Sequence, residues 1–118
     1  MATVTKIRVI TNNSLYAIQI INGENSNETF SIDAGAGWTG EIWIPWVASQ
    51  DEMNKAIEIV SDGETLFFVF QDYNDSTDQI KYYSTRSYPG ISMEGASMRG
   101  GKKTLSITST NKLKMHKV

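Results

Sequence analysis

A chain of 118 residues is long enough for one domain with a real hydrophobic core and too short for two. The absence of cysteine excludes disulfides, thiolate nucleophiles and cysteine-ligated metal centres, and it favours a reducing compartment. No apolar run is as long as a membrane-spanning helix, and the N-terminal segment lacks the apolar core of a signal peptide. We therefore expect a cytoplasmic protein, or one exported without a conventional signal peptide.

The net charge of −2 hides an uneven distribution along the chain. Residues 1–80 contain twelve acidic and three basic residues, whereas residues 81–118 contain eight basic residues and only Glu94 as an acid. Strands from distant parts of a chain often lie side by side, so we favour the interpretation that the two segments pair with each other. The alternative is a basic C-terminal surface that binds an anionic partner.

Apolar and polar residues alternate along most of the chain, which is typical of half-buried β-strands. In chain order, the pairs expected to face the core are Ile7 and Val9, Ile18 and Ile20, Phe30 and Ile32, Ile42 and Ile44, and Ile57 and Ile59. The run 66–70, "LFFVF", is apolar throughout, as in a central strand covered on both faces. Further alternation follows at 79–83 and 104–108, and the lysine-rich run 112–118 is expected to form an edge strand.

Turn-forming residues separate these runs, and short strands at such spacing indicate a β-sandwich or barrel. The predicted fold is all-β: one antiparallel β-sandwich domain over residues 1–118, jelly-roll or C2-like, with about eight strands. One short helical turn is expected near residues 50–55, because Ser49 and Glu52 form a capping-box pattern with Lys55 at the end of the turn.

The loops are expected to fall into two groups, because each connection that reverses the chain moves it to the other end of the sandwich. One end then carries the loops 12–16, 33–39, 62–64 and 85–102. The other end carries the loops 23–27, 45–54 and 71–78.

All three tryptophans lie within nine residues, yet Trp38 and Trp46 flank one predicted strand and so belong to opposite ends. Each of these two either binds a ligand or caps the core, and the sequence leaves both interpretations open. Trp43 faces away from the neighbouring isoleucines, so it points either outward or into a second layer. We favour packing against a second layer, since tryptophan is usually well buried.

The end with Trp46 is acidic and combines aromatic, carboxylate and amide side chains. Aromatic rings stack on the apolar faces of sugars, while carboxylates and amides hydrogen-bond to sugar hydroxyls. The candidate ligand-binding residues are Trp46, Asp51, Asp72, Tyr73 and Asp78. They predict a non-catalytic, lectin-like module that binds carbohydrate without a cofactor. The oxygen-rich run 72–78 also suits Ca²⁺, although a solvated turn is the favoured interpretation.

The opposite end is expected to place aromatic residues beside cations. Its candidate surface for an anionic membrane or another anionic partner consists of Trp38, Arg86, Tyr88, Arg99, Lys102 and Lys103. Aromatic residues of this kind lie at lipid interfaces, and lysine and arginine contact anionic headgroups. The acidic overall balance argues against nucleic acid as a partner. The charge split also predicts a third function, self-assembly into a homo-oligomer in which an acidic end meets a basic region.

No catalytic set is recognisable in the sequence, so we expect the protein not to be an enzyme. The one histidine, His116, lies in the basic C-terminal segment, so no serine–histidine–aspartate arrangement can be built around it and no histidine-rich zinc site is expected. No metal site is predicted. Small lectins and membrane-binding or lytic β-sandwich proteins share this general make-up at the level of fold alone, and fold does not determine function.

Overall fold

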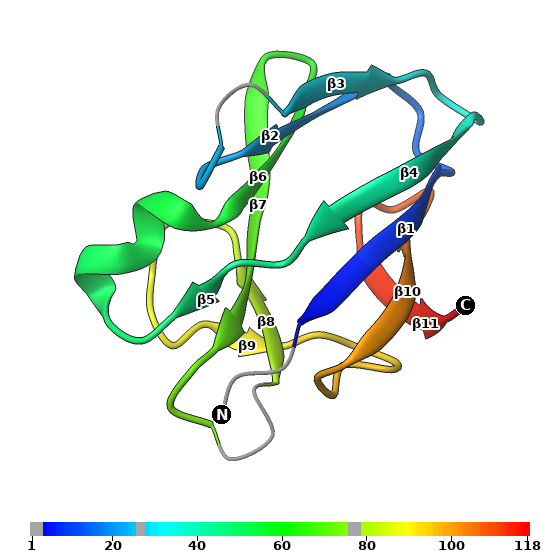
Figure 1. Cartoon of the computed structure of the whole chain (residues 1–118). Helices are drawn as coiled ribbons and strands as arrows, with labels where there is room; N and C mark the ends of the chain where they lie inside the picture. The colour runs from blue at the N-terminus through cyan, green and yellow to red at the C-terminus, as the bar shows by residue number, and fades with distance from the viewer. Residues whose placement is uncertain (1–3, 26–27, 76–78) are drawn as a thin grey trace.

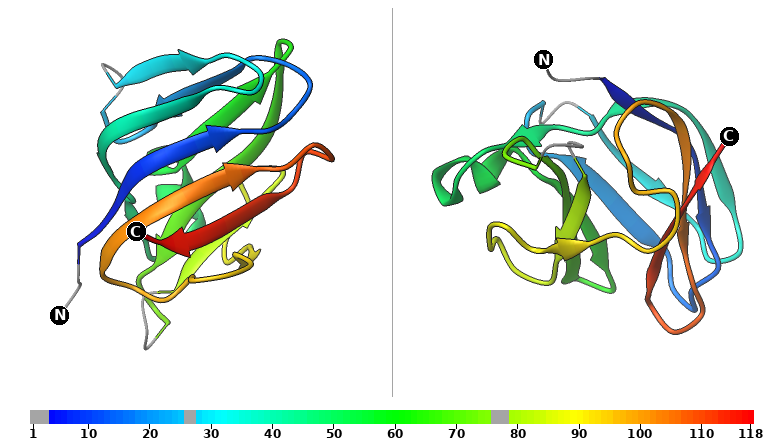
Figure 2. Two further views of the ribbon diagram at one scale, coloured as in Figure 1. Left: turned by 90° about the vertical axis from the view of Figure 1, so that its right-hand side faces the viewer. Right: turned by 90° about the horizontal axis from the view of Figure 1, so that it is seen from below.

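A computed structural model describes residues 4–25, 28–75 and 79–118. Within these residues the strands are β1 Thr5–Asn12, β2 Ile18–Asn22, β3 Thr29–Ile32, β4 Gly37–Trp43, β5 Trp46–Val47, β6 Ile57–Ser61, β7 Glu64–Asp72, β8 Ile80–Tyr83, β9 Ile91–Ser92, β10 Gly101–Ile107 and β11 Leu113–Lys117, and the 3-10 helix η1 spans Gln50–Lys55. The strands form two sheets that pack face to face (Figure 1, Figure 2). The predicted all-β sandwich is confirmed, and β5 and β9 are short strands that the alternation does not reveal.

The first sheet has the strand order β11-β10-β1-β4, and the second has β3-β2-β6-β7-β8-β9 with β5 beside β7. Most pairings are antiparallel, as predicted, but β1 with β10 and β5 with β7 are parallel. In the first parallel pair Thr5 faces Gly101 and Ile10 faces Leu105, so the two ends of the chain share one sheet. The lysine-rich β11 lies at the edge of this sheet, as expected.

The core residues predicted from alternation are buried in most strands. The inward isoleucines expected in β2 and β6, together with Ile42 in β4 and Ile44 just after it, are at most 1% exposed. Phe30 packs against the core while partly buried. The exception is β1, where a bulge between Ile7 and Val9 shifts the register. The extra residue of the bulge turns Ile10 into the core in place of Val9.

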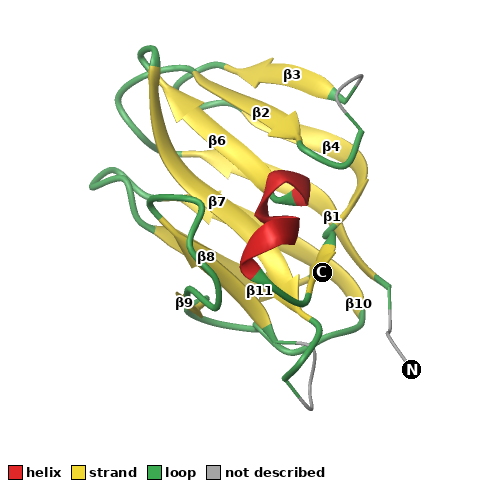
Figure 3. Cartoon of the chain, turned by 90° about the vertical axis from the view of Figure 1, so that its left-hand side faces the viewer, coloured by secondary structure: helices red, strands yellow, loops and turns green. Residues whose placement is uncertain are grey.

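β7 is covered on both faces, as its continuous apolar run predicts. Phe67 and Val69 pack in the main core between the sheets, whereas Phe68 and Phe70 point to the other side. There they form a second apolar cluster with Met53 of η1. Figure 3 shows the helix lying across the outer face of β7. No helix in the described part of the chain is long and apolar enough to cross a membrane.

The helical turn at 50–55 is confirmed, but its predicted capping box does not form. Ser49 is extended and its side chain makes no capping hydrogen bond. The carboxylate of Glu52 instead accepts the backbone N–H of Ala48 at 2.7 Å. Glu52 thus satisfies a backbone donor one residue before the N-cap, whereas a capping box requires it to accept the N–H of Ser49 itself.

Hydrogen bonds between loops confirm most of the predicted grouping. At one end, the Asn12 side chain donates to the carbonyls of Tyr16 and Ile32, which joins the loops after β1 and β3. At the other end, which we call the acidic end, Gly23 N–H donates to the Ala56 carbonyl and joins the loops after β2 and η1. The acidic end comprises the loops 23–25, 45–56 and 72–75.

The segment between β8 and β10 lies elsewhere than predicted. Ile80 N–H donates to the Ser97 carbonyl at 2.7 Å, so the loop before β10 reaches the acidic end instead of the opposite one. The reason is β9, which pairs with β8 (Lys81 opposite Ser92) and reverses the chain once more than the sequence indicates. Before β9 begins, the segment 84–90 lies along the outer face of β7, where Arg86 contacts the Phe68 ring and Tyr88 packs against Phe70.

Candidate functional site

Two of the five predicted ligand-binding residues border one groove at the acidic end. Trp46 and Tyr73 line a groove of about 230 Å³ together with Ala48, Glu52 and Lys55. The parallel pairing of β5 with the end of β7 brings the two aromatic residues together. Tyr73 is 52% exposed, and Trp46 is half-buried. The structure therefore brings these two predicted residues to one surface, and their role in ligand binding stays a prediction.

The charged residues of this groove were not predicted as site residues. Lys55 Nζ lies 2.9 Å from Glu52 Oε2. This bond, and then the N–H of Ala48, lower the pKa of Glu52 below its ordinary value. Their spacing of three residues in the predicted helical turn was the available signal, because residues at i and i+3 of a helix are neighbours. Glu52 and Lys55 neutralise each other in this ion pair. The groove therefore presents mainly the aromatic rings of Trp46 and Tyr73.

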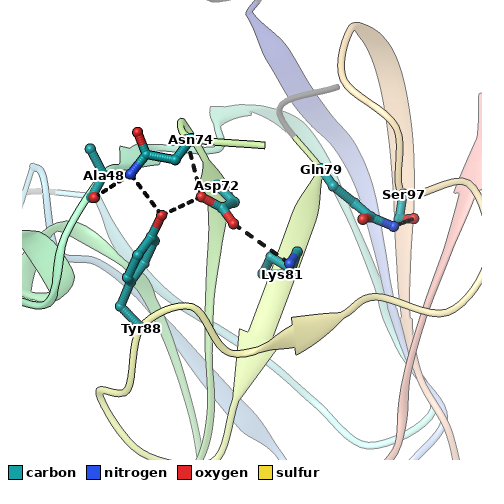
Figure 4. A network of polar contacts seen from close by, with 7 residues as sticks. All are labelled: Ala48, Asp72, Asn74, Gln79, Lys81, Tyr88 and Ser97. Atoms are coloured by element: carbon teal, nitrogen blue, oxygen red, sulfur yellow. Dashed lines mark hydrogen bonds and ion pairs between the residues drawn. The ribbon is translucent and has the colours of Figure 1, made fainter. Parts of the chain in front are cut away.

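Asp72 is a structural residue and not part of an open site. It is 6% exposed, and its Oδ1 accepts the Tyr88 hydroxyl at 2.5 Å and the Asn74 N–H at 3.1 Å (Figure 4). Lys81 Nζ lies 3.5 Å from Oδ2. We therefore correct the prediction for Asp72: its carboxylate ties three segments together and does not face a ligand.

The same network extends to the loop before η1. The Asn74 side-chain amide donates to the Ala48 carbonyl at 2.6 Å and to the Tyr88 hydroxyl at 3.0 Å (Figure 4). Burial, and then the hydrogen bond to Asp72, raise the pKa of the Tyr88 hydroxyl. Because these bonds connect the segments that carry Trp46 and Tyr73, the fold itself holds the two sides of the groove in place.

The remaining two predicted ligand-binding residues do not join the groove. Asp51 is exposed on η1 and does not border it. Asp78 lies outside the described residues.

A second hollow at the acidic end surrounds Trp43. The indole is 50% exposed, so the prediction that Trp43 packs against a second layer is wrong. Its Nε1–H donates to Glu41 Oε2 at 3.2 Å, and Lys6 Nζ lies 6.0 Å from the ring centroid. The hollow has a volume of about 430 Å³, and its other lining residues are Asn22, Glu24, Asn25, Glu28 and Glu41.

The carboxylates of this hollow differ in their hydrogen-bond and ion-pair partners. Glu41 lies 3.6 Å from Lys6 and 3.5 Å from Arg8, and the Trp43 hydrogen bond together with these cations lowers its pKa. Glu28 accepts the side-chain amide of Asn25 at 3.2 Å. The Glu24 carboxylate makes no hydrogen bond or ion pair within the described part of the chain. The hollow therefore presents an oriented aromatic face beside acceptors that are only partly engaged.

The sequence contained a signal for this second site. Trp43 stands between two inward-facing isoleucines, so its outward direction follows from alternation alone. The loop between β2 and β3 is rich in amides and carboxylates. That Glu24, Asn25 and Glu28 border one hollow with Trp43 depends on the positions of two sheets, which the local pattern does not contain.

The predicted surface for an anionic partner is divided among three places. Trp38 stacks on Phe30, with ring centroids 4.4 Å apart, and caps the core at the end opposite the acidic one. Arg86 lies on the outer face of β7, 4.6 Å above the Phe68 ring and 3.8 Å from Glu58. Tyr88 belongs to the Asp72 network. These three side chains are engaged with other parts of the fold.

The other three residues of that surface lie at the acidic end. Lys102 is opposite Lys6 on β1, whereas Trp38 is opposite Ile10, about 13 Å further along the same strand. Lys103 is buried. This separation results from the parallel pairing of β1 with β10. In this pairing the first residues of the two strands, Thr5 and Gly101, lie side by side, so Lys102 and Lys103 lie near the beginning of β1. A single aromatic and cationic surface of these six residues is therefore not formed.

The charged residues agree in part with each of the two interpretations of the sequence, which were pairing between the acidic and basic segments and a separate basic surface. Lys81 pairs with Asp72 and Arg86 with Glu58, so the basic and acidic segments do interleave. Five lysines make no ion pair with any described residue: Lys102, Lys103, Lys112, Lys114 and Lys117. Because part of this basic set lies beside the acidic loops, the head-to-tail geometry assumed for self-assembly is not the one that the fold presents.

No protein-family model, curated protein sequence or solved structure matches the chain. Within the described ranges, no group of three or more histidine or acidic side chains is placed to hold a metal ion. A role for Ca²⁺ and the absence of catalysis stay predictions. The chemistry of the acidic end is the basis on which a function can be assigned.

Proposed function

We propose that the protein is a non-catalytic carbohydrate-binding module that takes a neutral saccharide at its acidic end. The observation that carries this proposal is Trp43, whose indole is half exposed and held in one orientation by Glu41. Tryptophan is highly buried on average, so an ordered and exposed one is unusual. A ring that is already fixed loses little conformational freedom when it stacks on a sugar.

The rim of the Trp43 hollow supplies the polar contacts that sugar hydroxyls require. Glu24 and Glu28 offer carboxylate acceptors, and Asn25 offers an amide that both donates and accepts. The charge of Glu41 is offset by Lys6 and Arg8, but Glu24 and Glu28 have no such cation beside them among the described residues. Their like charge disfavours anionic sugars, which supports a neutral ligand.

The groove between Trp46 and Tyr73 is the second aromatic surface at this end. Its Glu52 and Lys55 already satisfy each other, so it offers fewer polar contacts than the Trp43 hollow. We assign it a weaker, auxiliary role in saccharide binding.

The direct test is a broad glycan array at neutral pH, with and without Ca²⁺, followed by calorimetry with the best neutral glycan. Trp43→Ala is expected to weaken binding about tenfold or more, as for an aromatic residue central to an interface. Tyr16→Ala is the matched control, because Tyr16 is also 54% exposed but lies at the opposite end. Binding of no glycan at all, or equal binding by Trp43→Ala and the wild type, contradicts the proposal. Loss only in Trp46→Ala moves the site to the groove.

A further inference from the structure

A third pocket at the acidic end is basic and separate from both aromatic sites. It has a volume of about 550 Å³ and is bordered by the glycine-rich segment 95–101 and by the adjoining ends of β10 and β11. Figure 1 shows this segment leading into β10. The charged side chains that line the pocket are Arg99, Lys102, Lys103 and Lys117.

Lys103 is the unusual member of this set. It stands on the inward face of β10 in alternation with Leu105 and Ile107, and it is only 2% exposed. Its ammonium group makes no hydrogen bond and no ion pair with any residue that the structure describes. Lysine side chains are rarely buried to this extent without a partner, because placing a charge away from bulk water is unfavourable.

The charge opposite Lys103 makes its position less favourable still. Lys117 on β11 is directly opposite Lys103 in the antiparallel pair. Like charges at facing positions of two strands repel each other. Burial, and then the charge of Lys117, lower the pKa of Lys103 below its ordinary value of 10.5. A bound anion between the two ammonium groups removes both penalties at once.

The main chain around the pocket permits a close approach by a ligand. Gly100 and Gly101 have φ angles of +88° and +80°, a region that side chains disfavour. The position of a Cβ atom on Gly101 has no neighbouring atom within 4 Å, so the space in front of it is open. The segment is anchored by Gly100 N–H, which donates to Thr5 Oγ1 at 2.6 Å.

We propose that this pocket binds a tetrahedral oxyanion, phosphate or sulfate, with Lys103 and Lys117 as its principal partners. Such an anion has several acceptor oxygens and can satisfy both ammonium groups and the cations at the rim in charge-assisted hydrogen bonds. The volume exceeds that of the anion alone, so the oxyanion is either free or the end group of a larger ligand. The site is independent of the saccharide proposal, because it shares no lining residue with the Trp43 hollow.

The test measures thermal unfolding of the full chain in inorganic phosphate and in chloride at equal ionic strength, with calorimetry of phosphate binding. We expect a saturable rise in Tm with phosphate and one site per chain. Lys103→Met keeps the length of the side chain without its charge. It is expected to abolish the saturable rise while unfolding at the same or a higher temperature in chloride, because the unpaired charge is gone.

Lys114→Met is the matched control, since Lys114 is exposed on the other face of the same edge strand. It is expected to retain the wild-type response to phosphate. Should Lys103→Met not fold, the exposed Lys117→Met is expected to weaken phosphate binding at least fivefold. A wild-type protein that responds equally to phosphate and chloride overturns the proposal, as does an unchanged response in both Lys103→Met and Lys117→Met.

A second measurement distinguishes the two sources of the oxyanion. Vesicles of phosphatidylcholine with phosphatidic acid present a phosphate monoester at a lipid surface. Co-sedimentation that free phosphate competes away, and that Lys103→Met loses, assigns the site to a lipid end group. Phosphate binding in calorimetry without co-sedimentation assigns it to a soluble ligand. Vesicle binding that neither phosphate nor Lys103→Met reduces, together with no phosphate binding, overturns the site.

Discussion

Asp72 and Lys103 are both buried charged residues at the acidic end, and their surroundings differ in an instructive way. Asp72 has a hydroxyl, a backbone N–H and an ammonium group around its two oxygens. Lys103 has a like charge opposite it and no described partner. A buried charge that is fully satisfied is part of the framework, whereas an unsatisfied one that borders a cavity indicates a place for a ligand. Burial alone does not separate the two cases.

The largest effect on the free energy of unfolding is expected from Asp72→Ala, which removes the buried carboxylate whose hydrogen bonds and ion pair are all satisfied. The change leaves Lys81 without its partner and removes the acceptor for Tyr88. We expect a loss of about 3 kcal/mol in the free energy of unfolding, as for one partner removed from a buried pair. Urea denaturation gives this value. Asp51→Ala, at an exposed position of η1, is expected to change it by less than about 0.5 kcal/mol, and equal losses in the two variants contradict the framework role.

A smaller effect is expected from Tyr88→Phe, which removes one hydroxyl from the same network. Loss of the hydrogen bond to Asp72 is expected to cost about 1–2 kcal/mol. Because the pKa of Tyr88 is raised above 10.0, the stabilisation is complete below pH 10.0 and is lost as the pH rises through the folded-state pKa. Unfolding measured from pH 8 to pH 11 should show a fall that is less steep in Tyr88→Phe. Identical pH profiles for the two proteins contradict this assignment.

The smallest effect on stability is expected from Lys103, the buried charge without a partner among the described residues, and it depends on pH. The folded-state pKa of Lys103 is lowered, so the folded state releases this proton before the unfolded state does. Stability without phosphate should therefore rise with pH between the folded-state pKa and 10.5. Lys103→Met should remove this rise, and phosphate should reduce it because the bound anion favours the charged lysine. If stability depends on pH in the same way in Lys103→Met and in the wild type, Lys103 is not a buried charge with a lowered pKa.

Most of the fold could be predicted because its signal is local. Alternation identifies the inward residues of β2, β4 and β6, and the continuous run in β7 predicts a strand with two covered faces. The bulge in β1, the two-residue β5 and β9, and the parallel pairs could not be predicted in this way. They depend on which distant strands meet, and a missed β9 is enough to move the following loop to the wrong end.

The site residues show the same difference between local signals and contacts that join distant segments. Trp46 and Tyr73 were predicted together because the alternation of loops between ends holds as far as β7. Asp72 was misread because composition does not show that Tyr88 returns to it from another segment. Lys103 had a local signal that was not used: it shares the inward alternation of Leu105 and Ile107. A lysine in phase with core residues is the pattern that predicts a buried charge.

The parallel pair of β1 and β10 also affects how the protein is made. β1 leaves the ribosome long before β10, because its neighbour on one side emerges only after Gly101 has been synthesised. At about 5–20 residues per second, the strand waits several seconds with that edge unpaired. Pairing β1 with β4 alone leaves Ile7 and Ile10 without the cover that the β10 and β11 side chains give them in the core. We therefore expect the amides of β1 to become fully protected from hydrogen exchange only in nascent chains from which β10 has emerged.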